Sequence, residues 1–150
     1  MKIKRGPIVF HNVISCTETC KINEWHLLAQ KIRNSVISSG LYGTGPIIYQ
    51  VSNLDEGNQE AEYTFHVPVN APVTMPEESP YRFAESLTFA DGLLLRHADL
   101  DEDIEESYEI LRACAESQQL VLKEAFYNIY LDVYGDGIID IYAPVMGGSE

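Results

Sequence analysis

The sequence predicts an α+β fold made of two β-α-β-β units, and two observations carry this prediction. The first is the order of patterns along the 150 residues, which runs strand, helix, strand, strand, connector, and then the same four patterns again. The second is a local likeness, because residues 64–69 and 140–145 both end in Pro-Val. We expect the two units to form one antiparallel sheet with two helices on one face and a central groove.

The first unit begins with an apolar, β-branched run at residues 8–16, which predicts a strand. A helix is expected next, and Gly40 suits its C-terminal end. Two further runs, 47–52 and 61–69, flank a polar loop and predict a hairpin. The apolar positions with helical spacing are Ile22, Trp25, Leu28, Ala29, Ile32 and Val36.

A connector at residues 70–80 contains three prolines and separates the two halves. Beyond it, a long strand is expected with a bulge at Asp91 and Gly92. Residues 99–102 then form a capping-box-like helix start, and the tight turn at 135–137 separates the last two strands. The predicted strands of this half are 83–97, 124–134 and 138–145, and its helical face comprises Ile104, Tyr108, Leu111 and Ala115.

We interpret residues 1–150 as a single domain built from two half-repeats, at about 8–70 and 83–145. Residues 48–49 fall opposite 129–130 at an offset of 81, whereas the closing strands match at an offset of 76. The alignment therefore requires a five-residue gap in the hairpin loop, which is longer in the first half.

The charge is strongly uneven along the chain. The net charge of −13 divides into +4 over residues 1–52 and −17 over residues 53–150. This acidity disfavours direct binding to nucleic acid and favours cationic small molecules or basic protein surfaces, although it could also serve only solubility. No apolar run is long enough to span a membrane, and no secretion signal is expected at the N-terminus.

Cysteines and histidines give little support for a metal site. Cys16 and Cys20 lack a second pair, and the four histidines are scattered, so reduced thiols in a cytoplasmic protein are the simplest interpretation. The acidic run at 97–103 has isoleucine where a calcium loop requires glycine, and a helix start explains it better. We therefore expect neither a metal nor another cofactor.

Four short segments follow one another along the chain at 45–49, 62–69, 127–131 and 139–145. Their sequences and their order resemble the GyrI-like small-molecule-binding superfamily, which includes effector-binding domains of AraC-type and MerR-type regulators and stand-alone gyrase-inhibitory proteins. The resemblance covers nearly the whole chain. We expect a stand-alone effector-binding domain, because the 150 residues leave no room for a helix-turn-helix.

The resemblance also implies a ligand groove lined by aromatic residues around an acidic residue on the last strand. Asp140 occupies that position here, whereas Asn128 stands where the family tends to have a second acid. Asp140 lies in an otherwise apolar strand, where a carboxylate is costly unless it is paired. A cationic ligand could supply that partner. The alternatives are a solvent-facing edge position or a bond to a nearby backbone amide.

Five aromatic residues complete the expected ligand-binding set. Tyr142 and Tyr130 should share a sheet face with Asp140 if the strands pair in register, opposite the aliphatic residues of the same strands. Trp25 and Tyr108 lie on the two predicted helices and could close the groove, and Tyr49 belongs to the matching strand of the first half. Ordinary core packing is the alternative for these rings.

Function is predicted as binding of a small apolar or cationic ligand, by a monomer or a homodimer. The alternative is a protein-interaction or inhibitor module that uses the acidic surface, either gyrase-inhibitor-like or an accessory of a toxin system. Catalysis has weaker support: Asp140 could activate water with Tyr130 or Tyr142 as proton donor, but no nucleophile motif is present.

Overall fold

A computed structural model describes four stretches of the chain. The predicted helix start at residues 99–102 lies outside the described residues, as does Gly135 of the predicted turn. No described helix has the length and apolar character needed to cross a membrane. The described stretches are residues 3–97, 104–123, 126–133 and 136–146.

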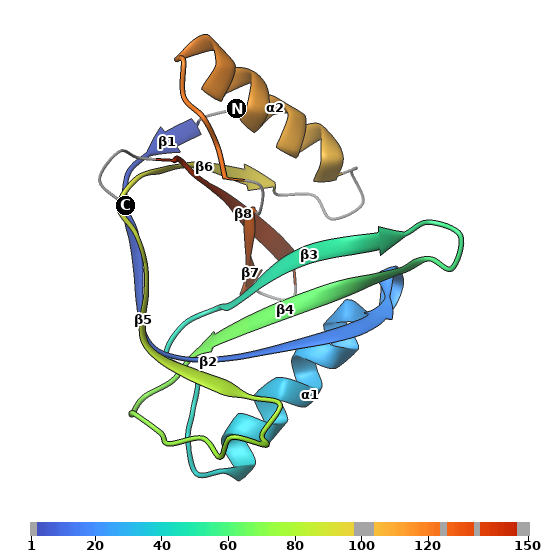
Figure 1. Ribbon diagram of the computed structural model, residues 1–150, viewed down its shortest axis with the longest axis vertical. Helices are drawn as coiled ribbons and strands as arrows, with labels where there is room; N and C mark the ends of the chain where they lie inside the picture. The colour runs from blue at the N-terminus through green and yellow to red at the C-terminus, as the bar shows by residue number, and fades with distance from the viewer. Residues whose placement is uncertain (1–2, 98–103, 124–125, 134–135, 147–150) are drawn as a thin grey trace. The chain divides into compact units, whose positions relative to one another are not determined.

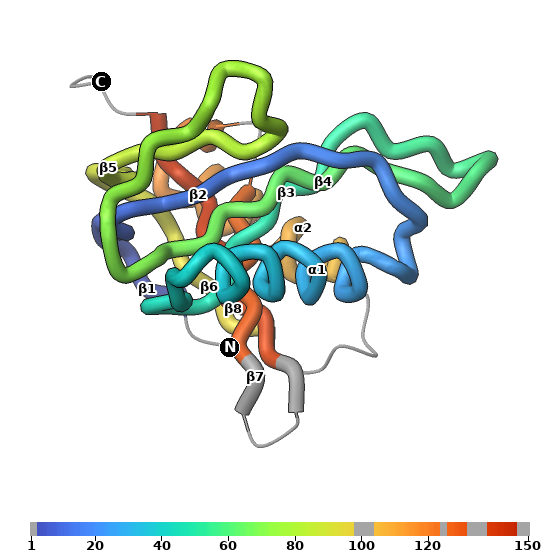
Figure 2. The backbone as a smooth tube through the Cα atoms, turned by 90° about the horizontal axis from the view of Figure 1, so that it is seen from below, coloured from blue at the N-terminus to red at the C-terminus, as the bar shows by residue number. Residues whose placement is uncertain are grey.

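The chain folds into two compact units, and each is described by itself. Unit 2 spans Phe10–Leu87, and unit 1 comprises Met1–Val9 with Thr88–Glu150. Figure 1 labels their elements and colours them in chain order, and Figure 2 shows the β3–β4 hairpin projecting from unit 2. The elements of unit 2 are most of β2 (Ile8–Lys21), η1 (Ile22–Glu24), α1 (Trp25–Ser38), β3 (Ile47–Asp55), β4 (Glu60–Pro68) and most of β5 (Arg82–Phe89). The first two residues of β2 and the last two of β5 belong to unit 1.

Unit 2 is an antiparallel sheet with strand order β3-β4-β2-β5 and with α1 against one face. Alternation along β4 turns Tyr63, Phe65 and Val67 toward the helix. All three are at most 3% exposed, and Ile32 and Val36 of α1 are equally buried. The residues that alternate along β4 and those with helical spacing in α1 therefore pack together in one apolar core.

Unit 1 repeats this architecture with α2 packed against β6. Its strand order is β1-β6-β8-β7, and β6, β7 and β8 pair antiparallel. Leu95, Ile141 and Leu111 are at most 1% exposed and form the centre of its core. Its elements are β1 (Ile3–Arg5), β6 (Gly92–His97), α2 (Ile104–Ser117), β7 (Tyr127–Val133) and β8 (Asp136–Pro144).

The predicted α+β class, with antiparallel strands and one helix in each half, is confirmed. Three details differ from the predictions. Strand β1 was not predicted, and it pairs with β6 although it precedes β2 in the chain. Strand β2 continues to Lys21, and the predicted strand 83–97 divides into β5 and β6 around Asp91. The groove between the two halves stays a prediction.

Equivalent backbone hydrogen bonds define the repeat more closely than the sequence does. Residues before the hairpin loops match at an offset of 79, and those after the loops match at 76. The predicted offset of 81 for the first hairpin strand is therefore wrong, and the gap is three residues. The matched bonds are Thr44 N–H to Pro68 O (3.0 Å) with Lys123 N–H to Pro144 O (2.8 Å), and Val69 N–H to Asn12 O (2.8 Å) with Val145 N–H to Asp91 O (3.0 Å).

Both helices end in the same hydrogen-bonded motif. The Leu41 N–H donates to Val36 O at 3.2 Å, and the Leu120 N–H donates to Ala115 O at 2.8 Å. The residue before each donor has a positive φ, as a Schellman motif requires. Gly40 takes φ 85° in unit 2, whereas Gln119 takes φ 59° in unit 1.

Candidate functional site

The candidate site lies in unit 1, on the sheet face that α2 does not cover. Strand pairing places Arg96 and Ile129 beside Asp140, and places Leu94 and Tyr127 beside Tyr142. The alternate residues of β8, Ile139 and Ile141, are buried on the helix side. We call the surface that α2 does not cover the Asp140 face. It comprises Leu94, Arg96, Tyr127, Ile129, Asp140 and Tyr142.

Asp140 forms a bidentate ion pair with Arg96 across the β6–β8 pair. The Arg96 Nε donates to Oδ1 at 2.8 Å, and Nη2 donates to Oδ2 at 3.2 Å. The two side chains differ in exposure, since Asp140 is 15% exposed and Arg96 is 59% exposed. The hydrogen bonds from the guanidinium to Asp140 also raise the pKa of Arg96. A sheltered carboxylate therefore has a counter-ion that extends into solvent.

Aromatic rings gather on the same side of unit 1. The Phe89 ring lies 4.6 Å from that of Tyr127 and 5.8 Å from that of Tyr142, centre to centre. The Lys123 ammonium lies over Phe89, 5.6 Å from the ring centre. Burial raises the pKa of Tyr127 above its ordinary value. These rings form an apolar surface that already attracts one cation through the ring face.

Tyr142 is fixed in place by its own contacts. Its hydroxyl donates to the Gly6 carbonyl at 2.7 Å, and its ring occupies the space where a Cβ on Gly92 would lie. Burial raises the pKa of Tyr142 to about 12, with a smaller contribution from the charge of Asp91. The tyrosine therefore stays protonated at neutral pH and contributes its ring, rather than its hydroxyl, to the Asp140 face.

The expectation that Tyr130 shares the face of Asp140 is wrong. Asp140 pairs with Ile129, and Tyr130 pairs with Ile139, which faces the helix. Strand alternation therefore places Tyr130 on the opposite face of the sheet. The same shift moves Ile129, which was expected opposite Asp140, onto the Asp140 face. Tyr127 takes the position predicted for Tyr130.

Tyr108 also lies on the helix side of the sheet. Its hydroxyl donates to Asn128 Oδ1 at 2.7 Å, and its ring makes an edge contact with Phe126. Asn128 is 1% exposed, so this bond satisfies a polar group that would otherwise be buried at a cost. The geometry therefore gives Tyr108 a structural contact in unit 1.

The remaining two predicted residues belong to unit 2. Trp25 stacks on Tyr49 with ring centres 4.6 Å apart. Tyr49 also contacts Tyr63 and Phe65, and it is only 4% exposed. These four rings form a core cluster between α1 and the sheet of unit 2. Of the six predicted residues, the structure thus brings Asp140 and Tyr142 together on one face.

A polar network that sequence reasoning missed lies on the helix-free face of unit 2. The Ser15 hydroxyl lies 2.7 Å from His66 Nδ1, and Gln50 Oε1 lies 2.8 Å from His66 Nε2. The amide oxygen accepts, so Nε2 carries the proton and Nδ1 accepts from Ser15. Burial, assisted by the charge of Arg82, lowers the pKa of His66 to about 4.

Arg96 was also missed, although the sequence held a signal for it. The predicted bulge at Asp91 and Gly92 marks where the strand of Arg96 begins, and antiparallel pairing with the last strand places Arg96 opposite Asp140. Tyr127 was missed because the assumed pairing of the last two strands placed Tyr130 on the Asp140 face, whereas Tyr130 pairs with Ile139. Phe89 and Lys123 gave no comparable signal, since their contacts depend on the path of the chain between strands.

Comparison by sequence finds no relative. No family model matches the chain, and no curated protein is detectably similar to it. The fold is therefore compared through solved structures.

Several solved structures share the fold. The C-terminal domain of EcmrR has a TM-score of 0.69 at 13% identity, over 97% of this chain and 99% of that domain. SAV2435 bound to tetraphenylphosphonium has a TM-score of 0.58 at 13% identity, over 98% of this chain and 95% of that one. A hydrolase from Listeria innocua has a TM-score of 0.61 at 12% identity, with coverage of 97% and 92%.

The chain also matches EcmrR in a complex with DNA, at a TM-score of 0.76 and 15% identity. It covers 57% of that protein's length, and 96% of this chain is matched. At these identities the likeness shows the fold alone. These structures share the fold of this chain, and the superfamily itself stays a prediction from the sequence.

Proposed function

We propose that the chain is a small-molecule-binding domain, and that the Asp140 face of unit 1 binds an apolar cation. The observation that carries the proposal is the unequal exposure of the Asp140–Arg96 pair, 15% against 59%. A sheltered carboxylate requires a counter-charge, but the identity of that charge is exchangeable. A ligand cation can replace Arg96, whose side chain then returns to water.

The exchange costs little because the guanidinium already lies mostly in solvent. Ion pairs with an exposed partner contribute about 0–1 kcal/mol, so their loss is offset by new contacts to the ligand. Tyr127 offers ring surface near the carboxylate, and Phe89 extends it, whereas Tyr142 is only 2% exposed and supports these two rings from within. A delocalised cation gains from both features, through the carboxylate charge and the ring faces. The tetraphenylphosphonium bound to SAV2435, which shares this fold, supports the choice of ligand class.

The test is calorimetric titration of the full chain with tetraphenylphosphonium. We expect Asp140→Asn to weaken binding by at least about tenfold, which corresponds to about 1.4 kcal/mol. Arg96→Gln should bind as tightly as wild type or more tightly, because the internal competitor is removed. Asp140→Asn keeps the shape of the residue it replaces, whereas Arg96→Gln shortens the side chain and removes its charge.

Matched controls come from the exposed Glu109–Arg112 pair of α2. Glu109→Gln and Arg112→Gln make the same charge changes away from the sheet, and both should bind as wild type does. Equal weakening by Asp140→Asn and Glu109→Gln would assign the effect to net charge and contradict the proposed site. Absence of heat with every folded variant would contradict the proposed function.

A further inference from the structure

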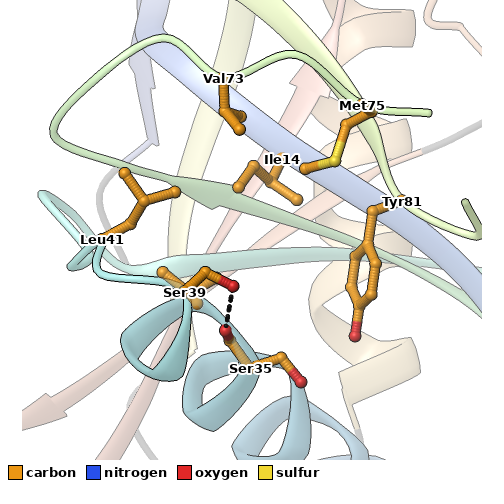
Figure 3. A pocket seen from close by; sticks show the side chains of 8 residues that line it. Ile14, Ser35, Ser39, Leu41, Val73, Met75 and Tyr81 are labelled. Atoms are coloured by element: carbon orange, nitrogen blue, oxygen red, sulfur yellow. Dashed lines mark hydrogen bonds between the residues drawn. The ribbon is translucent and has the colours of Figure 1, made fainter.

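We propose that unit 2 contains a second small-molecule site, specific for an uncharged single-ring compound. It lies where the connector between β4 and β5 covers the C-terminal end of α1 (Figure 3). The space measures about 130 Å³. One wall comprises Ile14 of β2 with Val36 and Leu41 at the end of α1. The other comprises Val73, Met75 and Tyr81 of the connector.

The connector wall is preformed. Each of its three lining residues adjoins a proline, since Val73 follows Pro72, Met75 precedes Pro76 and Tyr81 follows Pro80. Proline fixes its own φ and restricts the residue before it, so the three prolines and Met75 have few alternative conformations. Two hydrogen bonds also hold the segment: Ser79 N–H donates to Pro76 O at 3.0 Å, and Tyr81 N–H donates to Ser79 Oγ at 3.1 Å. A stiff wall keeps the cavity from closing.

Small residues on α1 keep the space open. Ser35 and Ser39 line the cavity, and their counterparts in unit 1 at the offset of 79 are the larger Cys114 and Gln118. The Ser39 hydroxyl donates to the Ser35 carbonyl at 2.8 Å, as Figure 3 shows. That hydroxyl oxygen still has room to accept one bond. The Ser39 donor is therefore already used, its oxygen can accept a bond from a ligand, and neither serine carries a charge.

Size and lining together define the ligand class. A dry apolar cavity of about 150 Å³ accommodates benzene in another protein. This cavity is similar in volume, and aliphatic, thioether and ring carbon make up most of its wall. No ionised group lines it. It therefore accepts benzene or phenol, with the phenol hydroxyl directed at the serines, and binds a charged ring such as benzylammonium more weakly, because the lining offers no counter-charge.

The experiment is a titration of the full chain with benzene, phenol and benzylammonium, followed by thermal unfolding and by the methyl NMR signal of Met75. Benzene and phenol should raise Tm by about 2–4 °C near saturation and shift the Met75 methyl. Benzylammonium should give smaller responses than benzene and phenol at the same concentration. Ser35→Leu fills the cavity from the helix side and should abolish both responses, while a raised Tm without ligand shows that it folds.

Two further variants complete the design. Ser38→Leu makes the same change three residues further along α1, at a residue that does not line the cavity, and should respond as wild type does. Met75→Phe narrows the cavity from the connector and should weaken binding if Ser35→Leu fails to fold. Asp140→Asn should leave the benzene response intact, which separates this site from the proposed function. Equal responses in wild type and Ser35→Leu, or no response in wild type, would overturn the proposal.

Discussion

The two units share a hydrogen-bonded backbone but fill it with different side chains. On the helix side of its sheet, unit 2 contains an aromatic cluster, whereas unit 1 has aliphatic residues and one buried amide at the same positions. The offsets of 79 and 76 give the correspondence Tyr49 with Asn128, Tyr63 with Ile139, and Phe65 with Ile141. The fold therefore depends on alternation and on the placement of turns, and not on which large side chains fill the core.

The helix-free faces differ in charge instead of size. Unit 1 places the Asp140–Arg96 ion pair there, while the equivalent positions of unit 2 hold Thr64 and Thr17, which bond to each other at 3.0 Å. A neutral pair needs no counter-ion, whereas the ion pair can exchange one. This difference in charge lies on the face that the fold leaves free of a helix. This supports the Asp140 face, rather than its unit 2 counterpart, as the binding surface.

The largest effect is expected from opening a cavity in the aromatic core. Phe65 is fully buried, so Phe65→Ala should lower the free energy of unfolding by about 3–5 kcal/mol. Its unit 1 counterpart gives the comparison, because Ile141→Ala should cost about 2–5 kcal/mol. Urea unfolding followed by circular dichroism measures both. Val51→Ala, at a position that is 41% exposed on β3, should cost less than about 1 kcal/mol, and a loss comparable to that of Phe65→Ala would refute the core assignment.

The next effect distinguishes the helix-free faces by pH. His66 has a pKa of about 4 when folded, against an ordinary value of 6.5. The unfolded chain therefore binds the proton first as pH falls. The stabilisation is complete above pH 6.5 and is lost between pH 6.5 and 4, in total about 3 kcal/mol at 1.36 kcal/mol per pKa unit. Tyr142, at the equivalent position in unit 1, does not titrate in this range.

Urea unfolding of wild type and His66→Gln at pH 7.5, 5.5 and 4.5 tests this prediction. Carboxylates also titrate below pH 5, so the difference between the two proteins is the relevant quantity. The loss of stability from pH 7.5 to 4.5 should be smaller in His66→Gln. Parallel pH curves for the two proteins would mean that the His66 network does not hold the imidazole neutral.

The sequence predicted element order and class because those depend on local patterns. Helical spacing in α1 and the turn at Gly40 are local, and both are confirmed. Register is not local: the assumed pairing of the last two strands placed Tyr130 on the face of Asp140, where the structure has Ile129 and Tyr127. Strand β1 escaped prediction because its three residues pair with β6, about 90 positions away. Predicting the ion pair of Asp140 would have required both the local pattern of its strand and the register between β6 and β8.

Strand β6 begins at Gly92, and a substitution there tests why this position lacks a side chain. Val13 is its counterpart in unit 2, where His66 stands in place of Tyr142. A Cβ at Gly92 would overlap the Tyr142 ring, so Gly92→Ala should cost about 1–3 kcal/mol. In a Tyr142→Ala background the same change should be nearly neutral. The thermodynamic cycle measures this coupling, and additive losses would show that the glycine is needed for its backbone conformation instead.

The smallest effect is expected where the two helices end. Gln119 takes φ 59° at the position where unit 2 has Gly40, and a left-handed conformation is costly for any residue with a Cβ. Gln119→Gly removes that cost but increases the freedom of the unfolded chain. The net result should be a gain of about 0.5–1 kcal/mol in the free energy of unfolding. Gly40→Ala should lose a similar amount, and this opposite pair of signs is the control within the molecule. If Gln119→Gly were destabilising, side-chain contacts of Gln119 would have to outweigh its backbone strain, and the helix ends would be equivalent in hydrogen bonds but not in energy.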